Sequence, residues 1–341
     1  MQLIPDNKKP AIDIHKRWLQ LCILGIVFFS LGPVAYLIHM IQEDIGWAVT
    51  IQNVFSTFEV GQAWTLTLII SLFFYVFVSV FPVLEKKRYA AVSIVFFVLL
   101  ILTMGWAGHP ASLEKIPGFI YHSMHFLAVS VWVGILLMVS WFSTNKENWL
   151  DFLKWFTPVA IISFIVTAVS GFMMMTIIID IADYADMWML NYGQALLLKH
   201  IIVIPILLFA FINGFLVKKQ LQKDLSFNPK PWVKAESVVL IIIFSVTAFL
   251  GQQPPPHEIE TMLKSNGAAP LFEYIYGSVV EPSMNVQFEV TVMSGLLAVL
   301  SIWFFVLMLA SFIRKAPAIL SFAISFFLVV SLYLSLMTSI Q

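Results

Sequence analysis

Long apolar segments alternate with short polar ones along the whole chain. Nine segments approach or exceed the roughly 20 apolar residues that an α-helix needs to cross a bilayer core. They lack the period-two alternation of strands, which favours helices. The predicted spans are 18–41, 61–83, 90–108, 118–142, 155–179, 192–217, 233–252, 287–312 and 316–339. The pattern therefore predicts an all-α fold, a polytopic bundle of about nine transmembrane helices.

Composition supports this interpretation. Hydrophobic residues make up 60% of the 341 residues and charged residues 11%, and the mean hydropathy is +0.92. A soluble domain has about 45–50% apolar and about 25% charged residues. We therefore expect a single integral membrane domain over 1–341, surrounded by membrane lipid. The longest polar connection, 253–286, is too short for a domain and is expected to form a lid or short interfacial helices.

The basic residues predict the orientation of the bundle. Sixteen of the nineteen lysines and arginines lie in the N-terminal segment and in every second connection after it. Only Lys115 and Lys264 lie in the other connections, and Lys199 lies within a span. Because Lys and Arg collect in short cytoplasmic loops, we expect the N-terminus inside, the C-terminus outside, and the 253–286 connection at the outer face.

Histidines collect near the predicted outer face. His109 directly follows span 90–108, and His122 and His125 lie roughly 6 and 10 Å inside the next span. Their i, i+3 spacing places both imidazoles on one helical face. Met173 and Met175 lie at a similar depth in span 155–179. Because imidazole and thioether groups suit copper, these five residues are the predicted metal ligands.

Four more polar residues lie in the predicted spans. His39 closes the first span on the outer side, Lys199 and His200 lie seven to eight residues into span 192–217, and Glu236 lies near the inner end of span 233–252. Such groups are costly in a bilayer and often functional, so gating or proton coupling is one interpretation. The alternatives are interhelical hydrogen bonds for the histidines, snorkelling for Lys199, and an ion pair with a nearby lysine for Glu236.

Several classes of protein find no support. The sequence has no nucleophile beside a base, no phosphate-binding glycine loop and no HExxH motif. We therefore expect no enzymatic activity, and an ATP-driven pump is excluded. No basic face indicates a nucleic-acid partner. With Cys22 as the only cysteine, an internal disulfide or thiolate cluster is impossible.

Ordered motifs lie between residues about 100 and 255, namely Trp106–Pro110, His122–Gly134, Ser170–Phe172, Tyr192–Lys199, Asn213, Glu236 and Thr247–Pro254. Together these motifs resemble the bacterial copper resistance protein D (CopD) family. The resemblance implies a multi-pass protein of the bacterial cytoplasmic membrane that takes up or handles copper. It makes His109, His122 and His125 the leading ligand candidates, and Lys199 and Glu236 motif positions of unknown role. It also implies a separate extracytoplasmic copper-binding protein as a possible partner.

Three functions stay open at this stage. The first is a copper permease, working in the direction of uptake, with its ion captured by the outer histidines. The second is a b-type haem protein for electron transfer, in which His122 or His125 pairs with His200 or His39 as axial ligands. The third is an assembly factor that delivers copper to a membrane oxidase. A copper ion is thus the expected ligand, and haem b is the alternative.

Overall fold

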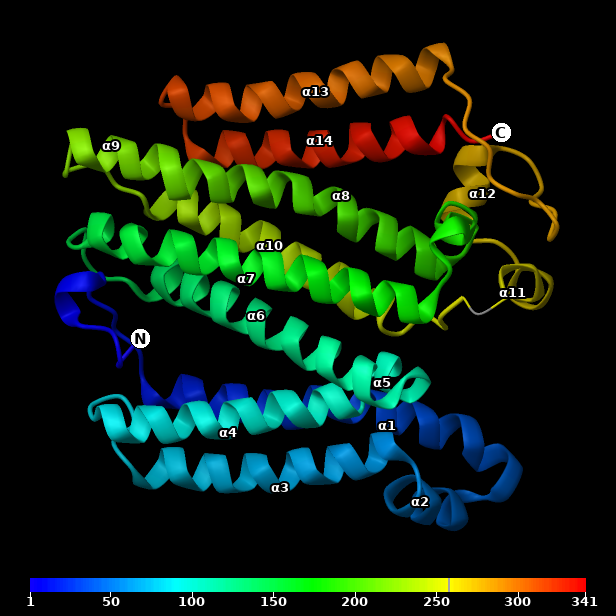
Figure 1. The fold of residues 1–341 in the computed structure, drawn as a ribbon, viewed down its shortest axis with the longest axis horizontal. Coiled ribbons are helices and arrows are strands. Elements are labelled where there is room, and N and C mark those ends of the chain that lie inside the picture. Colours follow the sequence, from blue (N-terminus) through cyan, green and yellow to red (C-terminus); the bar gives the residue numbers. More distant parts are fainter. Residues whose placement is uncertain (257) are drawn as a thin grey trace. The chain divides into compact units, whose positions relative to one another are not determined.

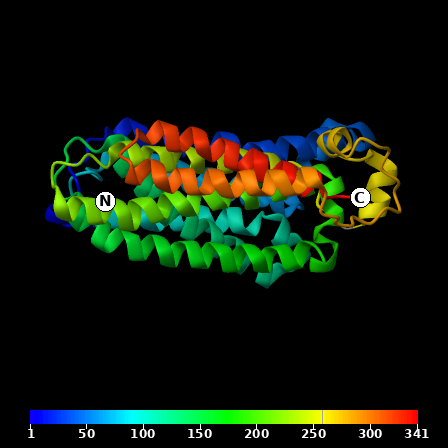
Figure 2. The same ribbon diagram turned by 90° about the horizontal axis from the view of Figure 1, so that it is seen from above.

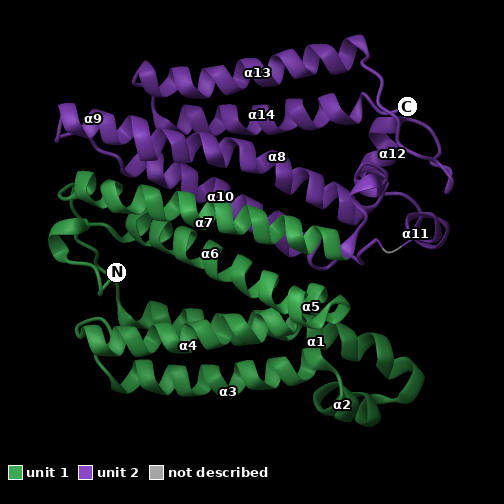
Figure 3. Cartoon of the chain, in the orientation of Figure 1, with its two compact units in different colours: residues 1–177 green, residues 178–341 purple. Residues whose placement is uncertain are grey.

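The computed structural model describes residues 1–256 and 258–341, and these residues are predominantly helical. Within them, nine helices are long and apolar enough to cross a membrane. The chain divides into two compact units, Met1–Ile177 and Ile178–Gln341 (Figure 3). The predicted all-α fold with nine spans is therefore confirmed, and most helix ends lie within a few residues of the predicted ones.

Unit 1 contains the first five long helices and two short ones (Figure 1). Helix α1 packs against α3, α3 against α4, and α4 against α6. The short helix α5 lies against the beginning of α6. The elements are α1 (Lys16–Ile45), α2 (Trp47–Ser56), α3 (Glu59–Val80), α4 (Lys87–Trp106), α5 (His109–Leu113), α6 (Lys115–Phe142) and α7 (Trp149–Ile178), whose last residue passes the unit boundary.

Aromatic and aliphatic side chains hold α1, α3 and α4 together. Ile23, Phe74, Val78 and Leu100 form a buried cluster, and the ring of Phe74 stacks on that of Phe96 at 5.2 Å between centroids. Since lipid is as apolar as these side chains, close packing and interhelical hydrogen bonds, rather than hydrophobic exclusion from water, stabilise such contacts. Helix α2 was not predicted, because its ten residues are too few to span a bilayer.

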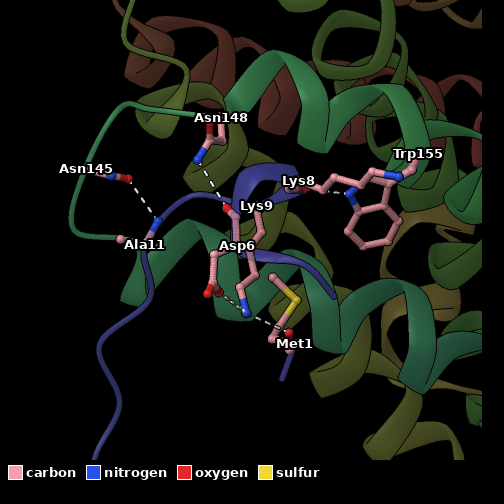
Figure 4. Close-up of polar contacts among 8 residues, drawn as sticks. All are labelled: Met1, Asp6, Lys8, Lys9, Ala11, Asn145, Asn148 and Trp155. Carbon is pink, nitrogen blue, oxygen red and sulfur yellow. Dashed lines mark hydrogen bonds and ion pairs between the residues drawn. The ribbon is translucent and has the colours of Figure 1, made fainter. Parts of the chain in front are cut away.

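The N-terminal segment is bound to the connection between α6 and α7 (Figure 4). The carbonyl oxygen of Lys8 accepts a hydrogen bond of 2.8 Å from the indole nitrogen of Trp155. The backbone nitrogen of Ala11 donates one of 2.9 Å to Oδ1 of Asn145. These bonds place the N-terminus at the end of unit 1 opposite to His109, His122 and His125.

Unit 2 is built around α8, which packs against α10, α13 and α14 (Figures 1 and 2). Helices α13 and α14 form a closely packed pair. The elements are two 3₁₀ turns, η2 (Ile181–Tyr184) and η3 (Asp186–Met189), then α8 (Asn191–Phe211), the π-helical segment η4 (Ile212–Val217), α9 (Lys218–Lys223), α10 (Lys230–Leu250), α11 (Ile259–Asn266), α12 (Pro270–Tyr276), α13 (Val292–Ile313) and α14 (Ala318–Met337).

The predicted connection 253–286 contains the short helices α11 and α12, as expected for its described residues. Two hydrogen bonds attach this region to the turns before α8. The backbone nitrogen of Ala269 donates to the carbonyl oxygen of Met189 at 2.7 Å, and that of Val286 donates to Oδ1 of Asp186 at 2.6 Å. The connection is thus part of the packed structure of unit 2.

The sixth span extends beyond its predicted end. It was expected to end at residue 217, but the helix continues through η4 to Lys223. Pro205 lies inside α8 and removes one main-chain hydrogen bond, and seven residues later the helix changes to π-type hydrogen bonding. π-helical turns occur frequently at functional sites, so the side chains of η4 are candidates for a functional role.

Candidate metal site and buried polar residues

His122 lies against the backbone at the corner between α4 and α5. A Cβ atom built on Gly108 would stand only 1.8 Å from Nδ1 of His122 and 2.3 Å from its Cε1. Only glycine therefore admits the imidazole at this position. Gly108 is also the residue before α5, which begins at His109 with a proline in its first turn. The half-buried ring of His122 thus lies beside the chain that carries the exposed His109.

His125 points toward α7 and contacts Ser170. Nδ1 of His125 lies 3.3 Å from Oγ of Ser170, and the same hydroxyl donates its hydrogen to the carbonyl oxygen of Val166 at 2.6 Å. With that hydrogen directed to Val166, Oγ can accept from Nδ1–H, and in this tautomer the lone pair of His125 lies on Nε2. A ligating histidine is commonly oriented in this way, by a hydrogen bond at its other nitrogen. Gly171 keeps the space beside the ring open, at 3.2 Å from Cε1 for an added Cβ.

The three consecutive methionines of α7 follow Ser170. At about 100° per residue, Met173 and Met174 flank the direction in which Ser170 faces His125, whereas Met175 points roughly 140° away. Met173 is 36% exposed, and the other two are half-buried. The register therefore favours Met173 and Met174 as the thioethers nearest to His125, and a role for Met175 stays a prediction.

The structure brings the predicted ligands to one end of unit 1 without assembling a complete metal site. We refer to Gly108, His109, His122, His125 and Ser170 as the histidine end. Among residues 1–256 and 258–341, no three His, Cys, Asp or Glu side chains form a group that could hold a metal ion. A metal ion here would therefore need other donors, such as thioether sulfur, in addition to imidazole.

The other predicted polar residues have separate surroundings. His39 is exposed near the end of α1. In unit 2, Nδ1 of His200 lies 2.6 Å from the hydroxyl of Tyr184 in η2. Burial raises the pKa of Tyr184 above its ordinary value, so this phenol stays protonated near neutral pH and can donate to the ring. Lys199, the neighbour of His200, is half-buried.

Glu236 has a partner that the sequence did not indicate. Its side chain is 2% exposed, and Nδ2 of Asn213, in η4, donates to its Oε2 at 2.8 Å. The hydrogen-bond partner that the structure gives this carboxyl group is a neutral amide, and an ion pair with Lys230 or Lys234 stays a prediction. Asn213 is itself 4% exposed, so the pair is buried between α10 and the π-helical segment.

Three residues that orient these groups received no role from the sequence. Gly108, Ser170 and Asn213 all lie within the family-like motifs, but only as positions of a pattern. Small or neutral side chains carry no chemical signal of their own. Their roles emerge only from distances to His122, His125 and Glu236.

The fold and these polar groups define a class: a multi-pass helical membrane protein with imidazoles at one end of its N-terminal unit. Comparison with protein families is more specific. The family model for copper resistance protein D matches residues 150–250, and that for the copper resistance protein D-like N-terminal domain matches residues 5–119. Together they cover more than half of the chain. The chain belongs to the copper resistance protein D family, as its motifs had indicated.

One curated relative is the copper transport protein CutJ of Bacillus subtilis (strain 168), which is 28% identical over 210 residues. The matched region is 58% of this chain and 37% of that protein, so this chain corresponds to little more than a third of its relative's length. No solved structure matches the chain.

Proposed function

We propose that this protein binds copper at the histidine end of unit 1 and carries it across the cytoplasmic membrane in the direction of uptake. Membership in the copper resistance protein D family and the likeness to a copper transport protein support this proposal. The observation that carries it is the hydrogen-bonded chain from Val166 through Ser170 to His125. That chain would orient the half-buried imidazole of His125 as a metal ligand.

The chemistry of this end suits copper. In the tautomer that Ser170 selects, Nε2 of His125 carries a lone pair, and neutral imidazole accepts either oxidation state of copper. A thioether from Met173, which the helix register places near His125, would favour Cu(I). His109, on an exposed helix start beside His122, would be the first group that an incoming ion meets. Zinc is less suited, since its sites more often recruit a carboxylate or cysteine.

Residues outside the histidine end have a secondary part in this proposal. His39, Lys199 and His200 would gate the path or exchange protons as the ion moves. The chain has no nucleotide-binding motif, so movement would follow a gradient or couple to another ion.

The test is the metal content of the purified, detergent-solubilised protein. We expect about one copper per chain in the wild type, and its loss in the His122→Ala/His125→Ala double variant. His15→Ala is the matched control, because His15 is exposed and immediately precedes α1 at the other end of unit 1. Copper retained in the double variant would refute the site.

Uptake by sealed vesicles then tests transport. Copper that enters wild-type vesicles, but not those with the double variant, is the expected result. Bound copper without any uptake would contradict transport and favour the assembly factor. Stoichiometric iron with a Soret band that the double variant lacks would overturn the copper site in favour of haem.

A further inference from the structure

A buried carboxyl group lies inside unit 2, remote from every residue of the histidine end along the chain. Glu236 is in α10, and Asn213, its partner, is in the π-helical segment η4. Both side chains are at least 95% buried. An ionised carboxylate in such surroundings is costly unless positive charge or several donors compensate it.

The orientation of the Asn213 amide follows from its neighbours. Nδ2 donates to Oε2 of Glu236 at 2.8 Å and to the carbonyl oxygen of Trp232 at 3.2 Å. Both of these atoms are acceptors, so a flipped amide would place oxygen against oxygen. Oδ1 of Asn213 is therefore the acceptor atom of this amide, and it is buried without a hydrogen-bond partner within the described residues. An orphaned buried acceptor typically costs about 1–3 kcal/mol.

The elements packed against α10 carry few charged groups. Helix α10 packs against α8, η4 and α14. Helix α14 has no charged residue, and the only ones in α8 are Lys199 and His200, more than roughly 19 Å along the helix from Asn213 at 1.5 Å per residue. Helix α9 contributes Lys218, Lys219 and Lys223, and α10 itself Lys230 and Lys234. The contact that the structure gives the carboxyl group is the neutral amide.

A proton on Glu236 resolves both difficulties. It removes the buried negative charge, and it converts the carboxyl group into a donor while Oε2 still accepts from Nδ2. A carboxylic acid and a primary amide can pair through two such hydrogen bonds, with O–H donated to Oδ1. Protonation takes one H⁺ from the solvent and converts the carboxylate to a neutral acid, and release returns that H⁺ to the solvent and restores the negative charge.

We propose that Glu236 and Asn213 form a proton-binding site inside the membrane, at which Glu236 is protonated and Asn213 stabilises the proton. The site would exchange its proton during the transport cycle, in step with copper. This coupling rests on the proposed function, whereas the protonation of Glu236 does not.

Infrared difference spectroscopy tests the proton directly. In spectra recorded between neutral and alkaline pH, we expect a carboxylic-acid C=O stretching band that Glu236→Gln abolishes. Asn213→Leu should shift this band to higher frequency, because the acid loses its hydrogen bonds. Gln194→Leu is the matched control, since Gln194 is an equally buried amide in unit 2 that contacts Tyr333 instead. If Asn213→Leu is not recovered from membranes, Asn213→Ser replaces it.

The outcomes separate the two claims. If Glu236→Gln removes no acid band, or if Asn213→Leu shifts it no more than Gln194→Leu does, the proton site is refuted. In vesicles, a pH gradient should stimulate copper uptake by the wild type but not by Glu236→Gln, although the variant still binds about one copper per chain. An equal response of both proteins would refute the coupling. Vesicles that take up no copper would refute the proposed function, and the infrared result would still decide the proton site.

Discussion

Replacing Gly108 by alanine should disable the histidine end without unfolding the protein. The added Cβ would stand 1.8 Å from Nδ1 of His122, while ordinary contacts begin at 3.4 Å. The imidazole must therefore retreat by the difference, 1.6 Å. Gly108 has φ −72° and ψ 145°, a conformation open to any residue, so the whole effect comes from this clash.

The displacement affects binding more than stability. Overpacking costs about 1–3 kcal/mol, and we expect the lower end of this range because the ring can rotate away. Metal ligands, in contrast, must keep their distances within about 0.2 Å. Removing a group that orients a metal ligand typically reduces metal affinity about 10- to 100-fold. Gly108→Ala displaces the ligand itself, so we expect at least this reduction in the affinity for copper.

Copper titration and thermal unfolding in detergent measure the two effects. Gly134→Ala is the control, because Gly134 lies within α6 with nothing inside 4 Å of an added Cβ, so alanine should be neutral or stabilising by about 0.5–1 kcal/mol. In Gly108→Ala/His122→Ala the stability loss due to the clash should disappear while copper binding stays absent. A Gly108→Ala protein that binds copper as tightly as the wild type would refute the role of His122.

Three further predictions follow from single contacts or from the charge pattern. Ser170→Ala should lower copper affinity about 10- to 100-fold, because the acceptor that orients the imidazole of His125 is lost. Ser163→Ala should leave copper affinity unchanged, since Ser163 is a buried serine two turns earlier in α7. Equal copper titration curves for Ser170→Ala and the wild type would contradict the argument. Tyr333→Phe should lower the free energy of unfolding by about 1–3 kcal/mol, because a buried amide oxygen loses its donor; an unchanged melting temperature would oppose this. In a Cys22→Ser background, a membrane-impermeant maleimide should label Ser265→Cys but not Ser226→Cys in intact cells, and the reverse result would invert the predicted orientation.

The spans could be predicted because their signal is local and strong. Each long helix must be apolar over its whole crossing, whatever its neighbours are. Helix α2 and the extension to Lys223 were missed for the same reason, since neither is required by the crossing. The short helices α11 and α12 were expected in kind, but only the structure supplies their bounds.

The candidate site was predictable only in part. His122 and His125 share a helical face by spacing alone, but their supports come from elsewhere in the chain. Gly108 lies in the preceding corner and Ser170 in the following helix, 45 residues from His125. The rotation of successive residues around α7 limits which methionine can lie near His125. That limit could be worked out only after the structure had shown that Ser170 contacts His125. Pairings between helices depend on packing, which a single sequence does not encode locally.

Two buried polar pairs in this protein differ in whether their hydrogen bonds are complete. Thr67 and Thr103 contact each other at 2.7 Å, and each also contacts a main-chain carbonyl of its own helix. Interhelical bonds of this kind are sufficiently explained by helix packing. Asn213, in contrast, retains an acceptor without a donor beside a buried carboxyl group. Packing alone gives no reason to keep such a group, since an apolar pair of similar shape would cost less. Reversible protonation of Glu236, as proposed above, would give such a reason.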